Sequence, residues 1–159
     1  MRGRSRQDPW TEDPDPRIRV LLECEPESST AIAAAIEVQG YSVRTCEGPR
    51  HGGCDLLAEG ACALVDGADV VVNLLDETLD GSRIRDAVAA TRRPPALVAE
   101  LTPAETRRAK RKTTGVPAGV TSRITVLQQP VNTKKLITAI EEALINQNRI
   151  VPIWGDGFC

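Results

Sequence analysis

Three aspartates flank one apolar stretch of the chain, and carboxylates are the side chains most suited to phosphoryl or metal chemistry. They are Asp69, Asp76 and Asp80, and the stretch that follows the first of them reads Val-Val-Val-Asn-Leu-Leu. A carboxylate can attack a phosphoryl group, and it can bind a hard cation such as Mg²⁺. Asn73, inside the stretch, carries an amide, which is a poor nucleophile and has no charge to hold a divalent metal. The segment therefore combines acidic neighbours with an unreactive centre.

The composition bounds the class of protein. The chain has 159 residues, with 41% apolar and 26% charged, which is typical of a single globular domain. Two Trp, one Tyr and one Phe are the only aromatic residues, so the core must be aliphatic. A net charge of −2 argues against nucleic acid as the partner. Without a bilayer-length apolar window or a secretory signal, we expect a cytoplasmic protein.

Five short apolar or β-branched runs alternate with helical segments. The predicted strands are 17–23, 41–46, 69–75, 96–101 and 124–127. The predicted helices are 30–39, 55–65 and 82–92, and two that follow the N-caps Thr102 and Asn132. Connections of this length favour parallel pairing and a three-layer α/β sandwich. We expect a disordered arm at 1–16, one domain at 17–145 and a tail at 146–159.

Three landmarks, met in the right order, resemble the receiver domain of bacterial response regulators. Val126-Leu-Gln-Gln-Pro-Val-Asn-Thr-Lys-Lys-Leu-Ile-Thr-Ala-Ile140 is similar to the family's fifth strand, its proline and its last helix. Asp80-Gly81 resembles the loop after the third strand, and Glu25-Pro26 the acidic turn after the first. The resemblance covers residues 17–145 and implies a flavodoxin-like, doubly wound five-stranded parallel sheet of order 2-1-3-4-5.

The resemblance also implies a site. Receivers accept a phosphoryl group on an aspartate that ends the third strand, and two acidic residues after the first strand hold Mg²⁺. These positions correspond to Asn73 and to the pair Glu23 and Cys24, with Glu25 next. A thiol does not suit Mg²⁺, and an amide cannot act as the nucleophile.

Two further family positions contact the phosphoryl group and report its presence. They correspond to Thr102, where the family's Thr or Ser is kept, and to Gln129, which replaces a lysine before Pro130 and lacks its charge. We therefore expect a pseudo-receiver that is not an enzyme, needs no cofactor or Mg²⁺, and is not phosphorylated by the usual route. A displaced register would bring Asp76 to the rim of the pocket, so phosphorylation there is an alternative.

The cysteines suggest a second alternative, a thiol or metal sensor. The expected strand order makes the carboxyl ends of the first two strands neighbours, which brings Cys24 near Cys46, with His51 and Cys54 in the next loop. Thiolates and imidazole are soft ligands. Against this, Cys46-x4-His51-x2-Cys54 is not a standard zinc spacing, and a buried cysteine is usually just a small apolar side chain. A phosphocysteine at Cys24 is disfavoured because carboxylates in residues 25–29 would repel the anion.

Two segments are candidates for partner binding. The predicted fourth helix carries a dense basic run: Arg107, Arg108, Lys110, Arg111 and Lys112. The run suits an acidic protein patch or RNA, although a solvated helix face explains it as well and no aromatic residues are interleaved for base stacking. In receivers the face of helix four, strand five and helix five is the usual partner surface.

The tail is the second segment, because Trp154 and Phe158 could anchor it to a partner or fold it back over the domain. Because only fourteen residues follow the predicted last helix, we expect a stand-alone signalling module, and the two segments predict that it binds a protein partner. Membrane is excluded, nucleic acid is disfavoured and a homodimer is compatible with the sequence.

Overall fold

The fold is known from a computed structural model that describes residues 9–10, 17–49, 53–76, 80–105, 107, 124–127 and 131–147. Its central element is one sheet built from β1 (Arg19–Glu23), β2 (Ser42–Cys46), β3 (Val70–Asn73), β4 (Ala96–Glu100) and β5 (Ile124–Leu127). All four pairings are parallel and the strand order is β2-β1-β3-β4-β5. The expected flavodoxin-like sheet is thereby confirmed, and each strand lies within its predicted range.

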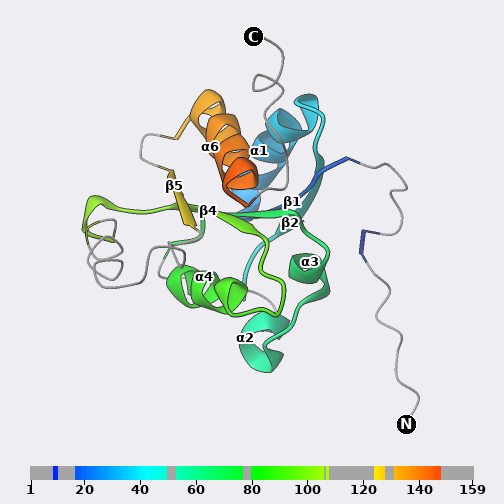
Figure 1. The fold of residues 1–159 in the computed structure, drawn as a ribbon, viewed down its shortest axis with the longest axis vertical. Coiled ribbons are helices and arrows are strands. Elements are labelled where there is room, and N and C mark those ends of the chain that lie inside the picture. Colours follow the sequence, from blue (N-terminus) through cyan, green and yellow to red (C-terminus); the bar gives the residue numbers. More distant parts are fainter. Residues whose placement is uncertain are drawn as a thin grey trace, which may run out of the picture.

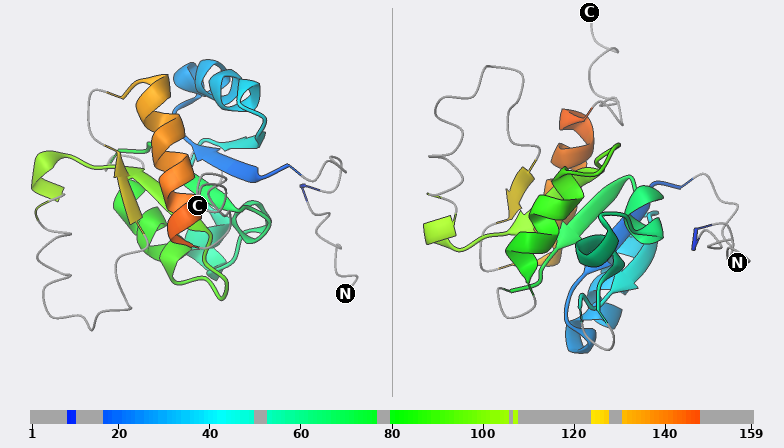
Figure 2. Two further views of the ribbon diagram at one scale, coloured as in Figure 1. Left: turned by 45° about the horizontal axis from the view of Figure 1, so that its top comes forward. Right: turned by 90° about the horizontal axis from the view of Figure 1, so that it is seen from below.

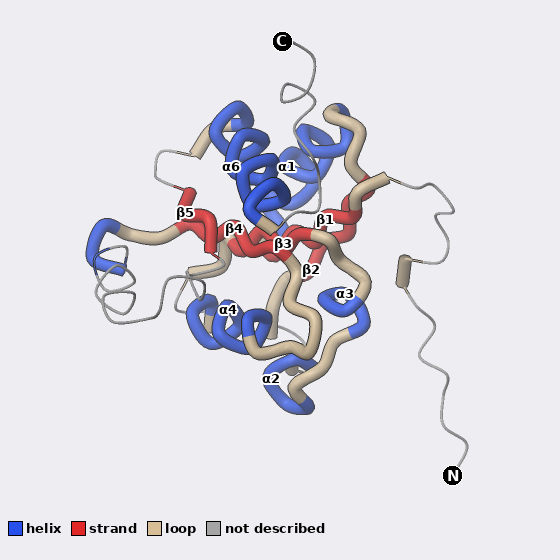
Figure 3. The backbone as a smooth tube through the Cα atoms, viewed as in Figure 1, coloured by secondary structure: helices blue, strands red, loops and turns tan. Residues whose placement is uncertain are grey.

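Helices cover both faces of this sheet (Figure 1 and Figure 3). On one face lie α1 (Pro26–Val38) and α6 (Thr133–Asn146), which are neighbours in Figure 1 and in the left view of Figure 2. The other face carries α2 (Asp55–Glu59), α3 (Ala63–Asp66) and α4 (Gly81–Ala89). The three layers follow from the right-handed crossovers of a parallel sheet. In the described part of the chain, no helix is long and apolar enough to cross a membrane.

Three helices differ from their predicted ranges, and the third of them, α4, ends at Ala89 instead of residue 92. The predicted helix 55–65 is two short helices, because Gly60 ends α2 in the left-handed conformation with φ of 74°. The first helix begins at Pro26 instead of residue 30, since proline suits the first turn and Glu25 takes the N-cap position. The last helix begins as predicted, with the Asn132 side chain accepting a hydrogen bond from the Lys135 N–H.

The sheet separates two apolar cores. Alternate residues of a strand point to opposite faces, so Leu22 and Val72 face α1 and α6, whereas Leu21 and Val71 face α2, α3 and α4. Every residue of β3 is buried, which explains its unbroken run of valines. Both cores are mainly aliphatic, as the composition requires.

One aromatic residue joins the second core from outside the sheet. Trp10 is fully buried, and its indole N–H donates a 3.1 Å hydrogen bond to the Leu64 carbonyl oxygen. The guanidinium groups of Arg19 and Arg44 lie 5.8 and 5.7 Å from the ring centroid, within cation–π range. The expectation of a disordered arm at 1–16 did not anticipate this contact, which fixes at least Trp10 to the domain.

Candidate functional site

Asn73 is the last residue of β3 and lies opposite Glu23, the last residue of β1, in the parallel register. The two carboxyl ends are neighbours because β1 and β3 are adjacent in the sheet. Both side chains follow Leu21 and Val71 toward the face covered by α2, α3 and α4. Asn73 is 0% and Glu23 3% exposed. The sequence positions carried over from the resemblance therefore meet as a buried polar pair.

The pair is joined by a direct hydrogen bond. The Asn73 Nδ2 group donates to Glu23 Oε2 over 2.8 Å. The other amide atom, Asn73 Oδ1, is the one buried side-chain N or O atom in the described residues that has no hydrogen-bond partner. An unsatisfied buried acceptor costs about 1–3 kcal/mol. The amide is thus held in place by Glu23 at some cost in stability, and it presents no nucleophilic oxygen.

Glu23 has an unusual proton affinity. Burial raises its pKa from 4.5 to about 7, against the opposing effects of the hydrogen bond from Asn73 and the positive charge of Arg85. A carboxyl group with this pKa changes its charge near neutral pH. It is therefore a weaker cation ligand than a fully ionised carboxylate.

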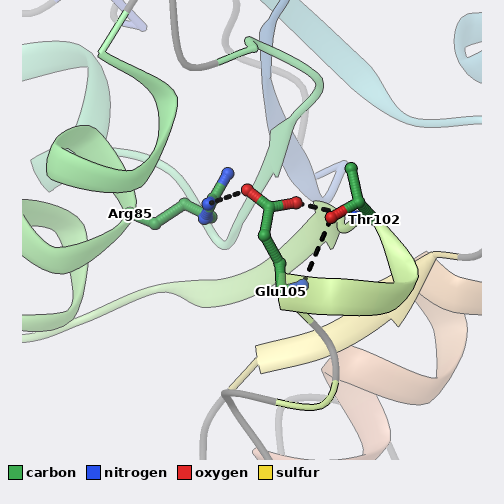
Figure 4. Close-up of polar contacts among 3 residues, drawn as sticks. All are labelled: Arg85, Thr102 and Glu105. Carbon is green, nitrogen blue, oxygen red and sulfur yellow. Dashed lines mark hydrogen bonds and ion pairs between the residues drawn. The ribbon is translucent and has the colours of Figure 1, made fainter.

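Arg85 acts on Glu23 through its positive charge and contacts a carboxylate in the segment that follows β4. It is buried in α4, and its Nη2 lies 3.5 Å from Oε1 of Glu105. Glu105 in turn accepts a 2.7 Å hydrogen bond from the Thr102 N–H through Oε2, and its own N–H donates to Thr102 Oγ1 over 3.2 Å. This reciprocal pattern is a capping box at the start of the helical residues 103–105. Figure 4 shows the three side chains in line from α4 to the end of β4.

Arg85 and Glu105 were not among the residues selected from the sequence. The Thr102-x-x-Glu105 spacing is a recognisable capping box and could have indicated Glu105. Arg85 gave no comparable signal, because a single arginine between Ile84 and Asp86 looks like an ordinary exposed helix residue.

The two residues after Glu23 point elsewhere. Cys24 belongs to the core beneath α1 and α6, and it lines a cavity on that side together with Glu25. Burial, followed by the charges of Glu25 and Glu47, raises the pKa of the Cys24 thiol to about 11. Glu23, Cys24 and Glu25 are therefore consecutive but not convergent, and they do not form one acidic cage around Asn73.

The three aspartates near Asn73 have separate places. Asp69 lies at the opposite end of β3, where its Oδ2 accepts a 2.9 Å hydrogen bond from the Arg19 N–H. Asp76 is exposed, three residues beyond Asn73. Asp80 precedes α4 with φ of 55°, and its carboxylate lies 3.7 Å from Arg83. The glycine that follows has no room for a side chain, since a Cβ on Gly81 would lie 2.2 Å from the Leu75 carbonyl oxygen.

The described cysteines lie in separate places, and none of them belongs to a cluster of metal-ligating side chains. In the described ranges, no cluster of three or more His, Cys, Asp or Glu side chains could hold one. The four described cysteines are free thiols, and Cys24 packs in one core while Cys46, Cys54 and Cys62 pack against the other. Adjacent strand ends thus bring the backbones of Cys24 and Cys46 together but not their thiols. Burial also raises the pKa of Cys46 to about 11.

Some of the expected site residues lie outside the described residues. These are Gln129, the basic residues Arg108, Lys110, Arg111 and Lys112, the tail residues Trp154 and Phe158, and His51. From the basic run, the structure describes Arg107, which is helical and exposed. Thr102 is exposed as well, at the N-terminus of the same helical segment.

Comparison with known proteins shows which solved structures share this fold. No family model and no curated protein matches the chain. Solved receiver domains do match, including the signal receiver domain of a putative Luxo repressor protein from Vibrio parahaemolyticus, with a TM-score of 0.57, 16% identity, and 84% and 94% of the two chains covered. A CheY-like response regulator receiver domain protein from Methanospirillum hungatei gives 0.56 and 14%, with 84% and 98% covered. A response regulator receiver domain protein from Bacillus halodurans gives a TM-score of 0.52 and 17% identity, with 80% and 97% of the two chains covered. At these identities the likeness is one of fold.

Proposed function

We propose that the chain is a receiver-like signalling module that binds a protein partner and does not accept a phosphoryl group by the usual route. One observation carries this proposal: the residue that ends β3 is an asparagine, and its amide is committed to a buried hydrogen bond with Glu23. An amide nitrogen facing a carboxylate offers neither a nucleophile nor a negative charge for a divalent ion.

The geometry around Asn73 supports the same reading. Of the acidic group at residues 23–25, only Glu23 faces Asn73, and its raised pKa leaves it partly protonated at neutral pH. Metal-assisted phosphoryl transfer needs several oxygen ligands and a nucleophilic oxygen close together. The described residues supply one such carboxyl group at Asn73.

Side chains inside the domain can hold the partner-binding surface in one conformation without a phosphoryl group. Arg85 contacts Glu105, and Glu105 caps the helical segment that begins after Thr102. In phosphorylatable receivers, the resemblance implies that the Thr after the fourth strand responds to the phosphoryl group. In this chain we propose that the Arg85–Glu105 contact holds the start of that helix in one arrangement, so the surface is permanently presented.

The chemical half of the proposal is tested by phosphorylation. The full chain is incubated with Mg²⁺ and acetyl phosphate beside a receiver that carries the usual aspartate, and intact masses are measured. The proposal expects a phosphoryl adduct on the control receiver and none on this chain. A stoichiometric adduct on this chain would contradict it, and loss of that adduct in Asp76→Asn would assign the site to the displaced aspartate.

The binding half is tested on the helical segment after Thr102. Arg107 is its exposed basic residue in the described part of the chain. The full chain is used to capture its protein partner, and the capture is repeated with Arg107→Glu. The variant should bind less of the partner, because a negative side chain would repel an acidic partner surface. Arg93→Glu is the matched control, since Arg93 is also exposed but follows α4. Equal capture by both variants and the unaltered chain would place the partner surface elsewhere.

A further inference from the structure

A groove lies between α1 and α6, on the face of the sheet away from the Asn73 side chain. It encloses a cavity of about 420 Å³ that reaches down to Cys24. Its apolar lining comes from Ile32, Leu74, Val131 and Leu136. This volume is in the range of pockets that hold a large side chain or a small ligand.

Most of the residues that line the α1 side of the groove are small. Ser28, Ala31 and Ala35 recur at helical spacing along one stripe and line the cavity. Val38 continues that stripe three residues beyond Ala35 and is 82% exposed, the highest value for a large hydrophobic residue in the described ranges. An apolar strip therefore runs along α1 from the cavity to the end of the helix.

We propose that the chain's own C-terminal segment, residues 148–159, binds along this strip and places Trp154 in the cavity. The segment contains Ile150-Val-Pro-Ile-Trp154, which is the most apolar sequence outside the described residues. It follows directly from α6, one wall of the groove. Burial of a tryptophan and neighbouring isoleucines against apolar side chains supplies the driving force.

The segment is long enough for this path. From Leu136, which lines the cavity, to Gln147 the helix rises about 17 Å at 1.5 Å per residue. Trp154 lies seven positions beyond Gln147, and an extended chain of that length spans about 23 Å. Pro152 favours an extended backbone and does not allow a helix to continue through it. Trp154 can therefore return along α1 and α6 to the cavity.

This inference is separate from the proposed function, because it uses the opposite face of the sheet from the Asn73 and Glu23 side chains. Phosphorylation of the chain would leave it unaffected. Likewise, an empty groove would not change the chemistry at Asn73. The inference concerns whether residues 148–159 cover the groove between α1 and α6, so that a partner would have to displace them to bind there.

The test follows the fluorescence of Trp154 in the full chain. The protein has two tryptophans, so subtracting the spectrum of Trp154→Phe from that of the unaltered protein isolates Trp154. The proposal expects emission at shorter wavelength, and weaker iodide quenching, than N-acetyltryptophanamide shows. Emission and quenching equal to that free compound would overturn it.

Groove variants give the second arm. Ala31→Arg places a long charged side chain in the groove, whereas Ala34→Arg places the same side chain on the part of α1 that faces β2. Both positions are exposed, and circular dichroism checks the fold of each. Only Ala31→Arg should shift Trp154 emission to longer wavelength and increase its quenching, and Val38→Gln should do so more weakly. Equal spectra for the two arginine variants, or shielding that disappears on dilution because a second copy supplies the tail, would contradict binding within one chain.

Discussion

Asn73 and Glu23 face each other across adjacent parallel strands, and Asn73 Nδ2 donates a 2.8 Å hydrogen bond to Glu23 Oε2 in a buried environment. The contact pairs a neutral amide with a buried carboxyl group. It also leaves Asn73 Oδ1 without a partner and Glu23 with a pKa of about 7. Both effects should change the free energy of unfolding, which urea denaturation measures.

Glu23→Gln should flatten the pH dependence of stability between about pH 4.5 and 7. The folded pKa of Glu23 lies above its unfolded value of 4.5, so the folded state binds the proton more tightly. The stability it contributes is full below pH 4.5 and is lost as pH rises through 7, by a total on the order of 3 kcal/mol. Glutamine stays neutral, so urea denaturation at several pH values should show this slope in the unaltered protein and not in the variant.

Glu37→Gln serves as the control, because Glu37 is exposed on α1 and the same chemical change there should leave the slope intact. If Glu23→Gln and the unaltered protein lose stability in parallel across that window, Glu23 is not the group that titrates.

Asn73→Asp should destabilise the protein most at alkaline pH. The new carboxylate would lie beside buried Glu23, and two adjacent buried carboxyl groups cannot both ionise cheaply. We expect a loss on the order of 2 kcal/mol at pH 8 that shrinks toward pH 5, where a shared proton relieves the repulsion. Urea denaturation of the variant at both pH values measures it.

The double variant Glu23→Gln/Asn73→Asp isolates the cause. With one acid removed, the alkaline penalty should fall, because the remaining carboxylate has no charged neighbour in the pair. A penalty that is the same with and without Glu23 would mean that Asp is excluded from this position by packing and not by charge.

The Arg85–Glu105 contact should show measurable coupling. Both groups are largely shielded from solvent, with side-chain exposures of 8% and 24%. A double-mutant cycle with Arg85→Met and Glu105→Gln should give an interaction free energy of about 1 kcal/mol. The exposed pair Arg83 and Asp80 is the internal comparison, and it should couple by about 0.5 kcal/mol or less.

Arg85 also bears on Glu23. Its positive charge lowers the pKa of Glu23, so Arg85→Met should raise that pKa further and move the upper end of the stability window to higher pH. Coupling of the same size in the exposed and the shielded pair, or an unchanged window, would argue that Arg85 is a surface residue in solution.

The sheet could be predicted from the sequence because its signals are local and redundant. The run of valines in β3 is typical of a strand buried on both faces, and a parallel sheet between two helix layers provides that burial. The correspondence of Asn73 with the family's phosphate-accepting position is obtained by counting back from Gly81, and it stays a prediction. The structure shows why Gly81 itself has no side chain, since a Cβ there would collide with the Leu75 carbonyl oxygen. Such constraints depend on near neighbours in the chain.

The rest of the site depends on long-range contacts that no local pattern encodes. Arg85 is buried, and the carboxylate that lies 3.5 Å from its guanidinium group belongs to Glu105, which is 20 positions further along the chain. Cys24 and Cys46 are adjacent in backbone but face different cores, since side-chain direction alternates from residue to residue. Trp10 joins the core from a segment whose prolines and charges indicate disorder.

Trp10 should be a major source of stability although it lies outside the sheet. Its ring is fully buried, and a Cβ on Gly67 would lie 2.2 Å from its Cδ1 atom, so the ring rests directly on the Gly67 backbone. Trp10→Ala should cost about 3–5 kcal/mol of unfolding free energy, as for other buried tryptophans. Gly67→Ala should also destabilise, because the added methyl group collides with the indole. In the Trp10→Ala background Gly67→Ala should cost much less, because the collision is gone, and urea denaturation of the four proteins measures the difference. Additive effects would mean that the ring does not rest on Gly67, and an unchanged midpoint for Trp10→Ala would mean that the arm does not pack onto the domain.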